Sequence, residues 1–277
     1  MNEDVVRHVR GARGPGTLLE ITPESVGWRY LSFRVVALAP GETLEANTSG
    51  TEVAIVPLAG AGTFTFGGGT YPISRTDVFS EKPHVLYLPP RTPYAISAVE
   101  SFEVAIGAAP ASGRYPARLF APGELPSFMR GGANVARGVT ATFDPAFPSE
   151  RLIAYEILTP SGNWSSFPPH RHDGRFGTSY HEETYYFRLS PEDGFAIQRL
   201  YTRDTDLDVA IPAADGDLVL VHEGYHTVAT APGTNAYYLN FLAGETKPVI
   251  QLNDPAYAWI AEDWPGRPIE IPLQPAT

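Results

Sequence analysis

Turn residues recur so often in this chain that they limit it to short stretches of regular structure. The 277 residues include 27 prolines and 26 glycines, which divide the sequence into segments at intervals of roughly 8 to 12 residues. Residues 28–39, for example, alternate well enough for a strand and end at the turn Pro40-Gly41-Glu42. This spacing is typical of a β-sandwich or β-barrel, and we predict an all-β fold.

A Pro- and Gly-rich stretch at 110–132 separates two halves with a similar pattern. In the first half we predict a strand at 52–58, a tight turn at Ala59-Gly60-Ala61-Gly62 and a return strand at 63–66. Each half also contains a strand that runs through a turn into a short return strand, at 87–96 and at 218–228. We therefore expect a duplicated β-barrel, with an N-terminal barrel at 1–125 and a C-terminal barrel at 126–277.

The composition argues against several classes of partner. The 20 basic and 31 acidic residues give a formal net charge of -11, which disfavours binding to nucleic acid. The chain has no cysteine, so a metal ion would have to be held by histidines and carboxylates. Residues 1–16 lack an apolar signal core, and no apolar run of about 18 residues occurs, so we expect a cytoplasmic protein with no membrane partner.

Five of the seven histidines lie between residues 162 and 226, where they form a pattern typical of metal ligands. His170 and His172 are one residue apart, so on an extended segment both side chains project to the same face. Glu183 heads a later aromatic strand, and His226 ends a Gly-Asp-apolar run. Three imidazoles and one carboxylate suit Zn, Mn, Fe or Ni and leave positions open for substrate. The alternative interpretation is an incidental His-x-His on a hydrated loop, which the convergence of several motifs disfavours.

These motifs resemble the paired metal motifs of the cupin superfamily. A narrower resemblance is to the 5-deoxy-glucuronate isomerase family, the bicupins of bacterial myo-inositol catabolism. It rests on residues 162–173, on Glu182-Glu183-x-Tyr185-Tyr186, and on residues 194–202 and 237–244. The Gly-Trp strand near residue 28 and the segment from Arg130-Gly131 to Arg137 also fit, so the resemblance covers nearly the whole chain.

The resemblance implies two tandem cupin barrels, which are double-stranded β-helices of the jelly-roll type. It also implies that one divalent metal per chain is held by His170, His172, Glu183 and His226. The first half has no His-x-His or equivalent Glu, so its barrel would be a structural partner without metal ligands. The identity of the metal is left open among Zn, Mn, Fe and Ni, because this ligand set accommodates several ions.

The implied activity is that of an intramolecular oxidoreductase, an aldose-ketose isomerase. It would convert 5-deoxy-glucuronate to 2-deoxy-5-keto-gluconate in myo-inositol catabolism with the help of the metal. The expected partner is a small sugar acid, and from the general habit of symmetric assembly we expect a homo-oligomer, a dimer or larger.

Some positions depart from the family pattern. His222 stands where the motif usually has Pro, Thr227 follows the last ligand where Pro is usual, and His181 precedes the Glu pair where an apolar residue is commoner. His181 and His222 therefore add imidazoles that complicate the ligand assignment. Neighbours on a strand point to opposite faces, so Glu182 and Glu183 are true alternatives. We choose Glu183 because it leads the Glu-x-Tyr-x-Phe set.

For catalysis we look to the strand that carries Gln198, Arg199 and Tyr201. Moving a carbonyl from C1 to C2 requires either proton transfer by a base and an acid or a hydride shift, and the sequence does not decide between them. Arg199 could hold the uronate carboxylate, and Tyr201 could shuttle a proton. The competing interpretations are a structural ion pair for Arg199 and a rim or core aromatic for Tyr201.

Other functions remain open at this point. The 5-keto-4-deoxyuronate isomerase of pectin breakdown shares the ligand pattern. A cupin dioxygenase would use the same four ligands, and a non-enzymatic sugar-binding cupin would use the site without turnover. The Trp-Ser-Ser-x-Pro-Pro run at 164–169 favours the inositol branch.

Overall fold

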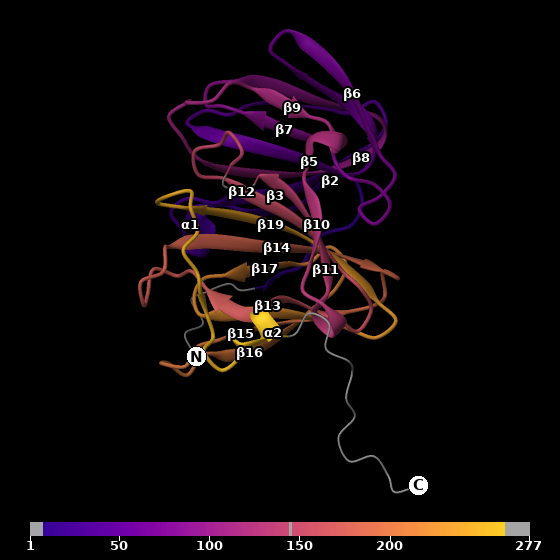
Figure 1. Cartoon of the computed structure of the whole chain (residues 1–277). Helices are drawn as coiled ribbons and strands as arrows, with labels where there is room; N and C mark the ends of the chain where they lie inside the picture. The colour runs from indigo at the N-terminus through magenta and orange to yellow at the C-terminus, as the bar shows by residue number, and fades with distance from the viewer. Residues whose placement is uncertain (1–7, 144–145, 264–277) are drawn as a thin grey trace, which may run out of the picture.

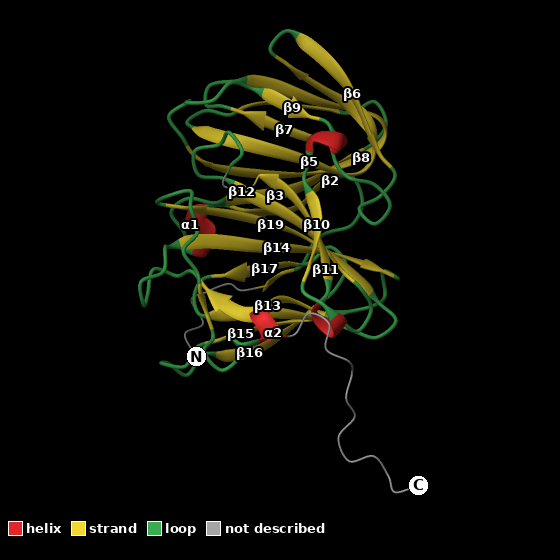
Figure 2. Cartoon of the chain, in the orientation of Figure 1, coloured by secondary structure: helices red, strands yellow, loops and turns green. Residues whose placement is uncertain are grey.

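The computed structural model describes residues 8–143 and 146–263, and strands dominate both stretches (Figure 2). The strands form three sheets of seven, five and eight strands. The all-β prediction is therefore confirmed. The helical segments in these residues are single turns: α1 (Pro23–Val26), η1 (Pro122–Glu124), η2 (Ala133–Val135) and α2 (Ile260–Asp263). None of the helices in the described ranges is long and apolar enough to cross a membrane.

The first half of the chain forms the eight-stranded sheet. Its main path runs β2 (Gly16–Ile21), β3 (Ser32–Leu38), β8 (Pro93–Pro110), β5 (Thr51–Phe66), β7 (Val85–Leu88) and β9 (Arg118–Phe120). Two further strands pair off this path, β4 (Thr43–Asn47) with β8 and β6 (Gly69–Arg75) with β5.

The prediction of two strands joined by a turn at 52–66 is wrong, because these residues form one long strand, β5. Its register against β8 shifts between Pro57 and Ala59 and again between Gly60 and Gly62, which bends the strand without ending it. Gly60 has φ +93, and a Cβ there would lie 1.6 Å from the carbonyl oxygen of Ser101. The glycines therefore allow two backbones to approach closely at a bend, and the actual turn follows at Gly67-Gly68.

The second half supplies the other two sheets. The seven-stranded sheet runs β1 (His8–Val9), β17 (Leu218–Val221), β14 (His181–Ser190), β19 (Asn235–Gly244), β12 (Ile153–Thr159), β11 (Arg137–Phe143) and β10 (Ser127–Arg130). The five-stranded sheet runs β16 (Asp208–Ala213), β15 (Ala196–Tyr201), β18 (Tyr225–Thr230), β13 (Trp164–Arg171) and β20 (Leu252–Asn253). Strands β2 to β9 thus belong to the eight-stranded sheet, and strands β10 to β20 belong to the other two sheets. Strand β1 is the exception in the first half, because it pairs with β17.

The buried apolar side chains form three cores. One lies in the first half, among residues such as Ile55, Phe64 and Ile96, and one lies in the second half, around Phe187 and Val228. The largest core joins the halves, with Phe33 of β3 packed near Phe241 of β19 at a ring-centroid distance of 5.8 Å. In Figure 1 the violet strands of the first half and the orange strands of the second accordingly stack on either side of β3, β12 and β19.

Strand β14 is buried along most of its length because it lies between two cores. Tyr186 faces the core that joins the halves, whereas Tyr185 and Phe187 face the interior of the second half. A strand covered on both faces needs no alternation of apolar and polar residues, which explains the run His-Glu-Glu-Thr-Tyr-Tyr-Phe. The alternation of faces also separates Glu182 from Glu183.

Candidate metal centre

The structure brings the four predicted ligands together from two facing sheets. His170 lies near the end of β13 and is the cross-strand partner of His226 on β18, while His172 follows β13. Glu183 comes from β14 in the other sheet. The nitrogen ligand atoms of the three histidines all lie within 4.8 Å of one another.

Each of the three imidazoles is oriented by a backbone carbonyl. Nδ1 of His170 contacts the carbonyl oxygen of Pro168 at 3.2 Å, and Nδ1 of His172 contacts that of His181 at 3.1 Å. Nδ1 of His226 lies 3.4 Å from the carbonyl oxygen of Gly224. A carbonyl accepts only, so each Nδ1 carries a proton, and whenever a ring is neutral its Nε2 keeps a lone pair. This is the arrangement that metal-binding histidines usually have.

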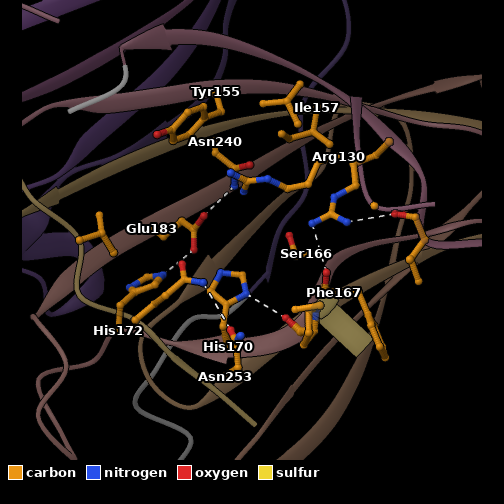
Figure 3. A pocket seen from close by; sticks show the side chains of 18 of the residues that line it. Arg130, Tyr155, Ile157, Ser166, Phe167, His170, His172, Glu183, Asn240 and Asn253 are labelled. Atoms are coloured by element: carbon orange, nitrogen blue, oxygen red, sulfur yellow. Dashed lines mark hydrogen bonds and ion pairs between the residues drawn. The ribbon is translucent and has the colours of Figure 1, made fainter. Parts of the chain in front are cut away.

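Glu183 completes the group. Its Oε2 lies 2.9 Å from Nε2 of His172 and 3.1 Å from Nε2 of His226. Its Oε1 accepts a hydrogen bond of 3.0 Å from Nδ2 of Asn240 on β19, which fixes the plane of the carboxylate (Figure 3). Asn240 was not among the residues predicted from sequence, because nothing in its local sequence marks it as a partner of β14.

The ligand atoms lie close enough together for one divalent ion to bind them. Oε2 of Glu183 lies 2.9 and 3.1 Å from two imidazole nitrogens, and the ligand nitrogens of the three histidines lie within 4.8 Å of one another. Nε2 of His226 is buried and makes no hydrogen bond with the described residues, as expected for a lone pair aimed at an ion.

The electrostatics of the group also favour a cation. Burial, followed by the charges of His226 and His172, lowers the pKa of His170 to about 3, so this imidazole is neutral at pH 7. Burial would raise the pKa of Glu183, but the charge of His226 and the hydrogen bond from His172 outweigh burial and lower it. Glu183 is thus ionised and His170 neutral, as metal binding requires. Burial would lower the pKa of His172, but its hydrogen bond with Glu183 outweighs burial and raises the pKa, so a metal ion would displace a proton from this ring.

Glu182 has a different role from its neighbour. Its carboxylate accepts hydrogen bonds from the backbone N–H groups of Arg29, Tyr30 and Leu31, at 2.6, 2.9 and 2.8 Å. It therefore ties β14 to the segment that leads into β3. Of the two glutamates that the sequence left as alternatives, only Glu183 faces the histidines.

His181 and His222 lie outside the ligand group. Nε2 of His181 contacts the carbonyl oxygen of Thr246 at 2.8 Å, and its Nδ1 contacts Ser179 Oγ at 3.0 Å. Nε2 of His222 contacts the carbonyl oxygen of Val26 at 3.0 Å. Both imidazoles are thus engaged with neighbouring loops.

A cavity of about 590 Å³ opens over the ligands. Figure 3 shows His170, His172 and Glu183 on one side of it, with Arg130, Tyr155 and Asn240 around the same space. Ser166, Tyr185 and Tyr238 contribute hydroxyl groups to the lining, and Ser166 Oγ lies 3.0 Å from Tyr185 Oη and 3.2 Å from Tyr238 Oη. A pocket of this size suits a small organic substrate.

The three predicted catalytic residues do not line this cavity. Arg199 is paired with Asp208 at 2.7 Å, and its side chain is 42% exposed, which matches the competing interpretation as a structural ion pair. Tyr201 is buried and donates a hydrogen bond to Asp254. Gln198 is buried on β15 opposite Val228, and its amide has no hydrogen-bond partner among the described residues.

Instead, the cavity contains two arginines to which the sequence reasoning gave no role. Arg130 ends β10 and Arg137 begins β11, and both line the cavity. The signal available in the sequence was the segment from Arg130-Gly131 to Arg137, where two arginines flank a glycine-containing turn.

The first half has the equivalent strand but not the equivalent chemistry. Glu183 pairs with Val221 of β17, and Val53 of β5 pairs in the same way with Leu88 of β7. Val53 is buried in the apolar core of the first half. The described residues of that half accordingly hold no group of metal-binding side chains like that of the second.

Comparisons with known proteins extend over nearly the whole chain. The model of the KduI/IolB family matches residues 5–260. A 5-deoxy-glucuronate isomerase from Geobacillus thermodenitrificans is 40% identical over 252 residues, which are 89% of this chain and 92% of that protein. The corresponding protein from Geobacillus kaustophilus is also 40% identical over 252 residues, 89% of this chain and 91% of that protein.

Solved structures give the same picture. An IolB-like protein from Salmonella typhimurium superposes with a TM-score of 0.89 at 32% identity, covering 92% of this chain and 99% of that one. An oxalate decarboxylase from Bacillus subtilis superposes with a TM-score of 0.64 at 13% identity, covering 90% of this chain and 79% of that one. The second similarity, at 13% identity, concerns the fold alone.

Proposed function

Because this chain belongs to the KduI/IolB family, we propose that it converts 5-deoxy-glucuronate to 2-deoxy-5-keto-gluconate with the help of one divalent metal ion. The observation that carries the proposal is the convergence of His170, His172, Glu183 and His226 beneath a cavity large enough for a six-carbon sugar acid. Relatives at 40% identity bear the name of this isomerase, which identifies the substrate that we propose.

The metal would be held by Nε2 of the three histidines and by Oε2 of Glu183. A divalent ion there would act as a Lewis acid on the carbonyl oxygen and the neighbouring hydroxyl of the substrate. Asn240 keeps Oε1 of Glu183 engaged through a 3.0 Å hydrogen bond, so that Oε2 stays directed at the histidines.

The hydroxyl groups of the cavity would orient the sugar. Burial and the nearby charge of Glu183 raise the pKa of Tyr185 well above its ordinary value, and burial also raises the pKa of Tyr238. Both phenols therefore stay protonated at neutral pH and can donate hydrogen bonds to substrate hydroxyls. Ser166, between them, has φ 50, a left-handed conformation that is uncommon for serine and holds its Oγ against both rings.

We further propose that the chain acts in the cytoplasm, as a homo-oligomer of two or more copies, with its two barrels divided near residues 125 and 126. The change of sheet between β9 and β10 supports that division. The choice among Zn, Mn, Fe and Ni is a matter for metal analysis.

The proposal is tested by elemental analysis of the purified protein beside an NMR time course with 5-deoxy-glucuronate. We expect about one equivalent of divalent metal per chain and conversion of the aldehyde to the keto acid. Removal of the metal with a chelator should abolish conversion, and adding it back should restore it. His226→Ala should lose metal and turnover together, whereas His84→Ala, in the first half, should retain both.

Two results would contradict the proposal in different ways. If the protein contains metal but does not convert 5-deoxy-glucuronate, the proposed metal centre stands and the proposed substrate is wrong. The next compound to assay would then be 5-keto-4-deoxyuronate. Loss of metal in His84→Ala would contradict the assignment of the site to the second half.

A further inference from the structure

We propose that Arg137 and Arg130 form a carboxylate-binding subsite in the same cavity as the metal ligands. The identification of the bound group as the carboxylate of a sugar acid rests on the proposed function. The subsite itself is inferred from the burial, pairing and surroundings of the two guanidinium groups.

Arg137 is a buried cation that has no carboxylate partner among the described residues. Three arginines are buried among the described residues, and two of them have carboxylate partners, Arg75 with Glu156 at 2.7 Å and Arg171 with Asp173 at 2.6 Å. Arg137, which is 7% exposed, makes no ion pair within the described ranges. A buried charge is costly unless it is paired, so this position favours an anion that the described residues do not provide.

The guanidinium of Arg137 is held in place by two carbonyl groups. Nη1 donates to the carbonyl oxygen of Val135 at 3.0 Å, and Nη2 donates to that of Phe167 at 3.2 Å. A guanidinium has five N–H groups, so these bonds leave several donors for a ligand. Phe167 lies on β13, three residues before His170, so the same strand fixes Arg137 and carries a metal ligand.

Arg130 adds a second positive charge, near enough to act on the first. The two residues are cross-strand partners in the pairing of β10 with β11, a position where like charges destabilise a sheet. Burial, together with the charge of Arg130, lowers the pKa of Arg137. A carboxylate between the two guanidinium groups would relieve both the repulsion and the missing counter-ion.

Gly131 makes room for this arrangement. It has φ +75, and a Cβ at this position would lie 2.3 Å from the carbonyl oxygen of Val135 and 2.8 Å from Nη1 of Arg137. Any other residue here would displace the guanidinium or the carbonyl that fixes it. The turn between the two strands therefore maintains the position of the Arg137 guanidinium.

The charge of the cavity contrasts with that of the chain. The formal net charge of the chain is -11. In contrast, the Arg, Lys, Asp and Glu side chains that line the cavity among the described residues are two arginines and Glu183. The carboxylate of Glu183 already contacts His172 and His226. The cavity thus concentrates positive charge in an acidic protein, which favours an anionic substrate over its neutral counterpart.

The first test compares the binding of glucuronate and glucose, which differ at C6, by calorimetry with the protein as purified. We expect wild type to bind the acid about 10- to 100-fold more tightly, the range expected for hydrogen bonds between charged groups. Arg137→Gln and Arg130→Gln should abolish this preference with metal content unchanged. Arg137→Lys should keep part of it, because lysine retains the charge but not the planar fork. Arg118→Gln, at an exposed arginine of β9 paired with Glu124, is the matched control and should behave as wild type.

The second test uses turnover. For 5-deoxy-glucuronate, Arg137→Gln should raise KM about 10- to 100-fold and change kcat much less. Arg130 is exposed, so Arg130→Gln provides a variant that tests the subsite even if Arg137→Gln does not fold.

Several outcomes would overturn the subsite. One is that Arg137→Gln and Arg130→Gln both keep the preference for glucuronate over glucose. Another is that these variants lose the binding of glucose and of glucuronate equally. A third is that Arg199→Gln loses the preference for glucuronate while Arg137→Gln keeps it. If wild type does not isomerise 5-deoxy-glucuronate but its preference for glucuronate depends on Arg137, the proposed function fails while the subsite stands.

Discussion

Glu52 and Glu182 make the same set of hydrogen bonds in opposite directions across the junction of the two halves. Glu182, in the second half, accepts hydrogen bonds from three successive backbone N–H groups just before β3 in the first half. Glu52, in the first half, accepts hydrogen bonds from three successive backbone N–H groups just before β12 in the second half. These are the N–H groups of Glu150, Arg151 and Leu152, at 2.7, 2.6 and 2.8 Å. Each also accepts from a tyrosine, Tyr87 for Glu52 and Tyr180 for Glu182. Both are almost fully buried.

This reciprocity predicts that Glu52→Gln and Glu182→Gln destabilise the protein to a similar extent. Each substitution places an amide N–H₂ against donors that need an acceptor, which should cost about 2 to 3 kcal/mol and lower Tm by roughly 5 °C. Thermal unfolding followed by circular dichroism measures the shift. Glu100→Gln, at an exposed residue of β8, is the matched control. A normal Tm in either buried variant would show that the backbone donors are satisfied in another way.

Glu182 and Glu183 point to opposite faces of β14, so we predict that only substitution of Glu183 affects the binding of metal. Glu183→Gln should lower metal content and turnover by more than about 100-fold, because it removes the charged ligand. Glu182→Gln should keep its metal, since its side chain points to the junction between the halves. Elemental analysis of the two variants after identical purification separates these outcomes, and loss of metal in Glu182→Gln alone would reverse the assignment.

Asn240 should act through the orientation of Glu183. We expect Asn240→Ala to weaken metal affinity about 10- to 100-fold, the range for partners of metal ligands, and we expect excess metal to restore activity. Titration of the metal-free protein with metal gives the affinity. Asn47→Ala, which removes an acceptor for Ser49 N–H in an exposed turn of the first half, serves as the control. Activity that excess metal does not restore would mean that Asn240 contacts the substrate instead.

Glu150 predicts a specific dependence of stability on pH. Burial would raise its pKa, but hydrogen bonds from the backbone N–H groups of Arg114, Ser112 and Gly113 and from the Ser112 hydroxyl lower it to about 2. The folded-state pKa of Glu150 lies below the ordinary value of 4.5. The ionised side chain therefore contributes to the free energy of unfolding above pH 4.5, and this contribution is lost as the pH falls towards 2. After allowance for solvent screening, the contribution of Glu150 should be about 1 kcal/mol.

The difference in unfolding free energy between wild type and Glu150→Gln, measured with urea, should therefore be constant from pH 6 to 8 and shrink below about pH 4.5. A difference that grew on acidification would contradict the assignment.

The residues that could be predicted from sequence are those whose pattern is local. His170 and His172 are one residue apart on a strand, so two-residue periodicity was enough to predict that they share a face. The choice of Glu183 over Glu182 depended in addition on the resemblance to the cupin motif. Arg130 and Arg137 could not be found this way, because they meet only through the pairing of β10 with β11. Arg199 appeared similar in sequence, but its pairing with Asp208 on the neighbouring strand β16 depends on a register that composition does not encode.

The same limit explains the wrong turn at 59–62. Glycines in a strand pattern indicate either a reversal or a close backbone approach, and only the contact between Gly60 and Ser101 distinguishes the two. The duplicated architecture was easier to predict, because strand and turn spacing repeats along the chain even where residue identities differ.

The position shared by Val53 and Glu183 makes different chemical demands on the two halves. Both halves keep the glutamate that joins them, Glu52 or Glu182, and differ at the very next residue. Val53 only has to fill space in an apolar core, so other apolar side chains of similar volume can occupy its position. Glu183 has to present a carboxylate oxygen to two imidazoles, so the equivalent position in the second half accepts far fewer side chains.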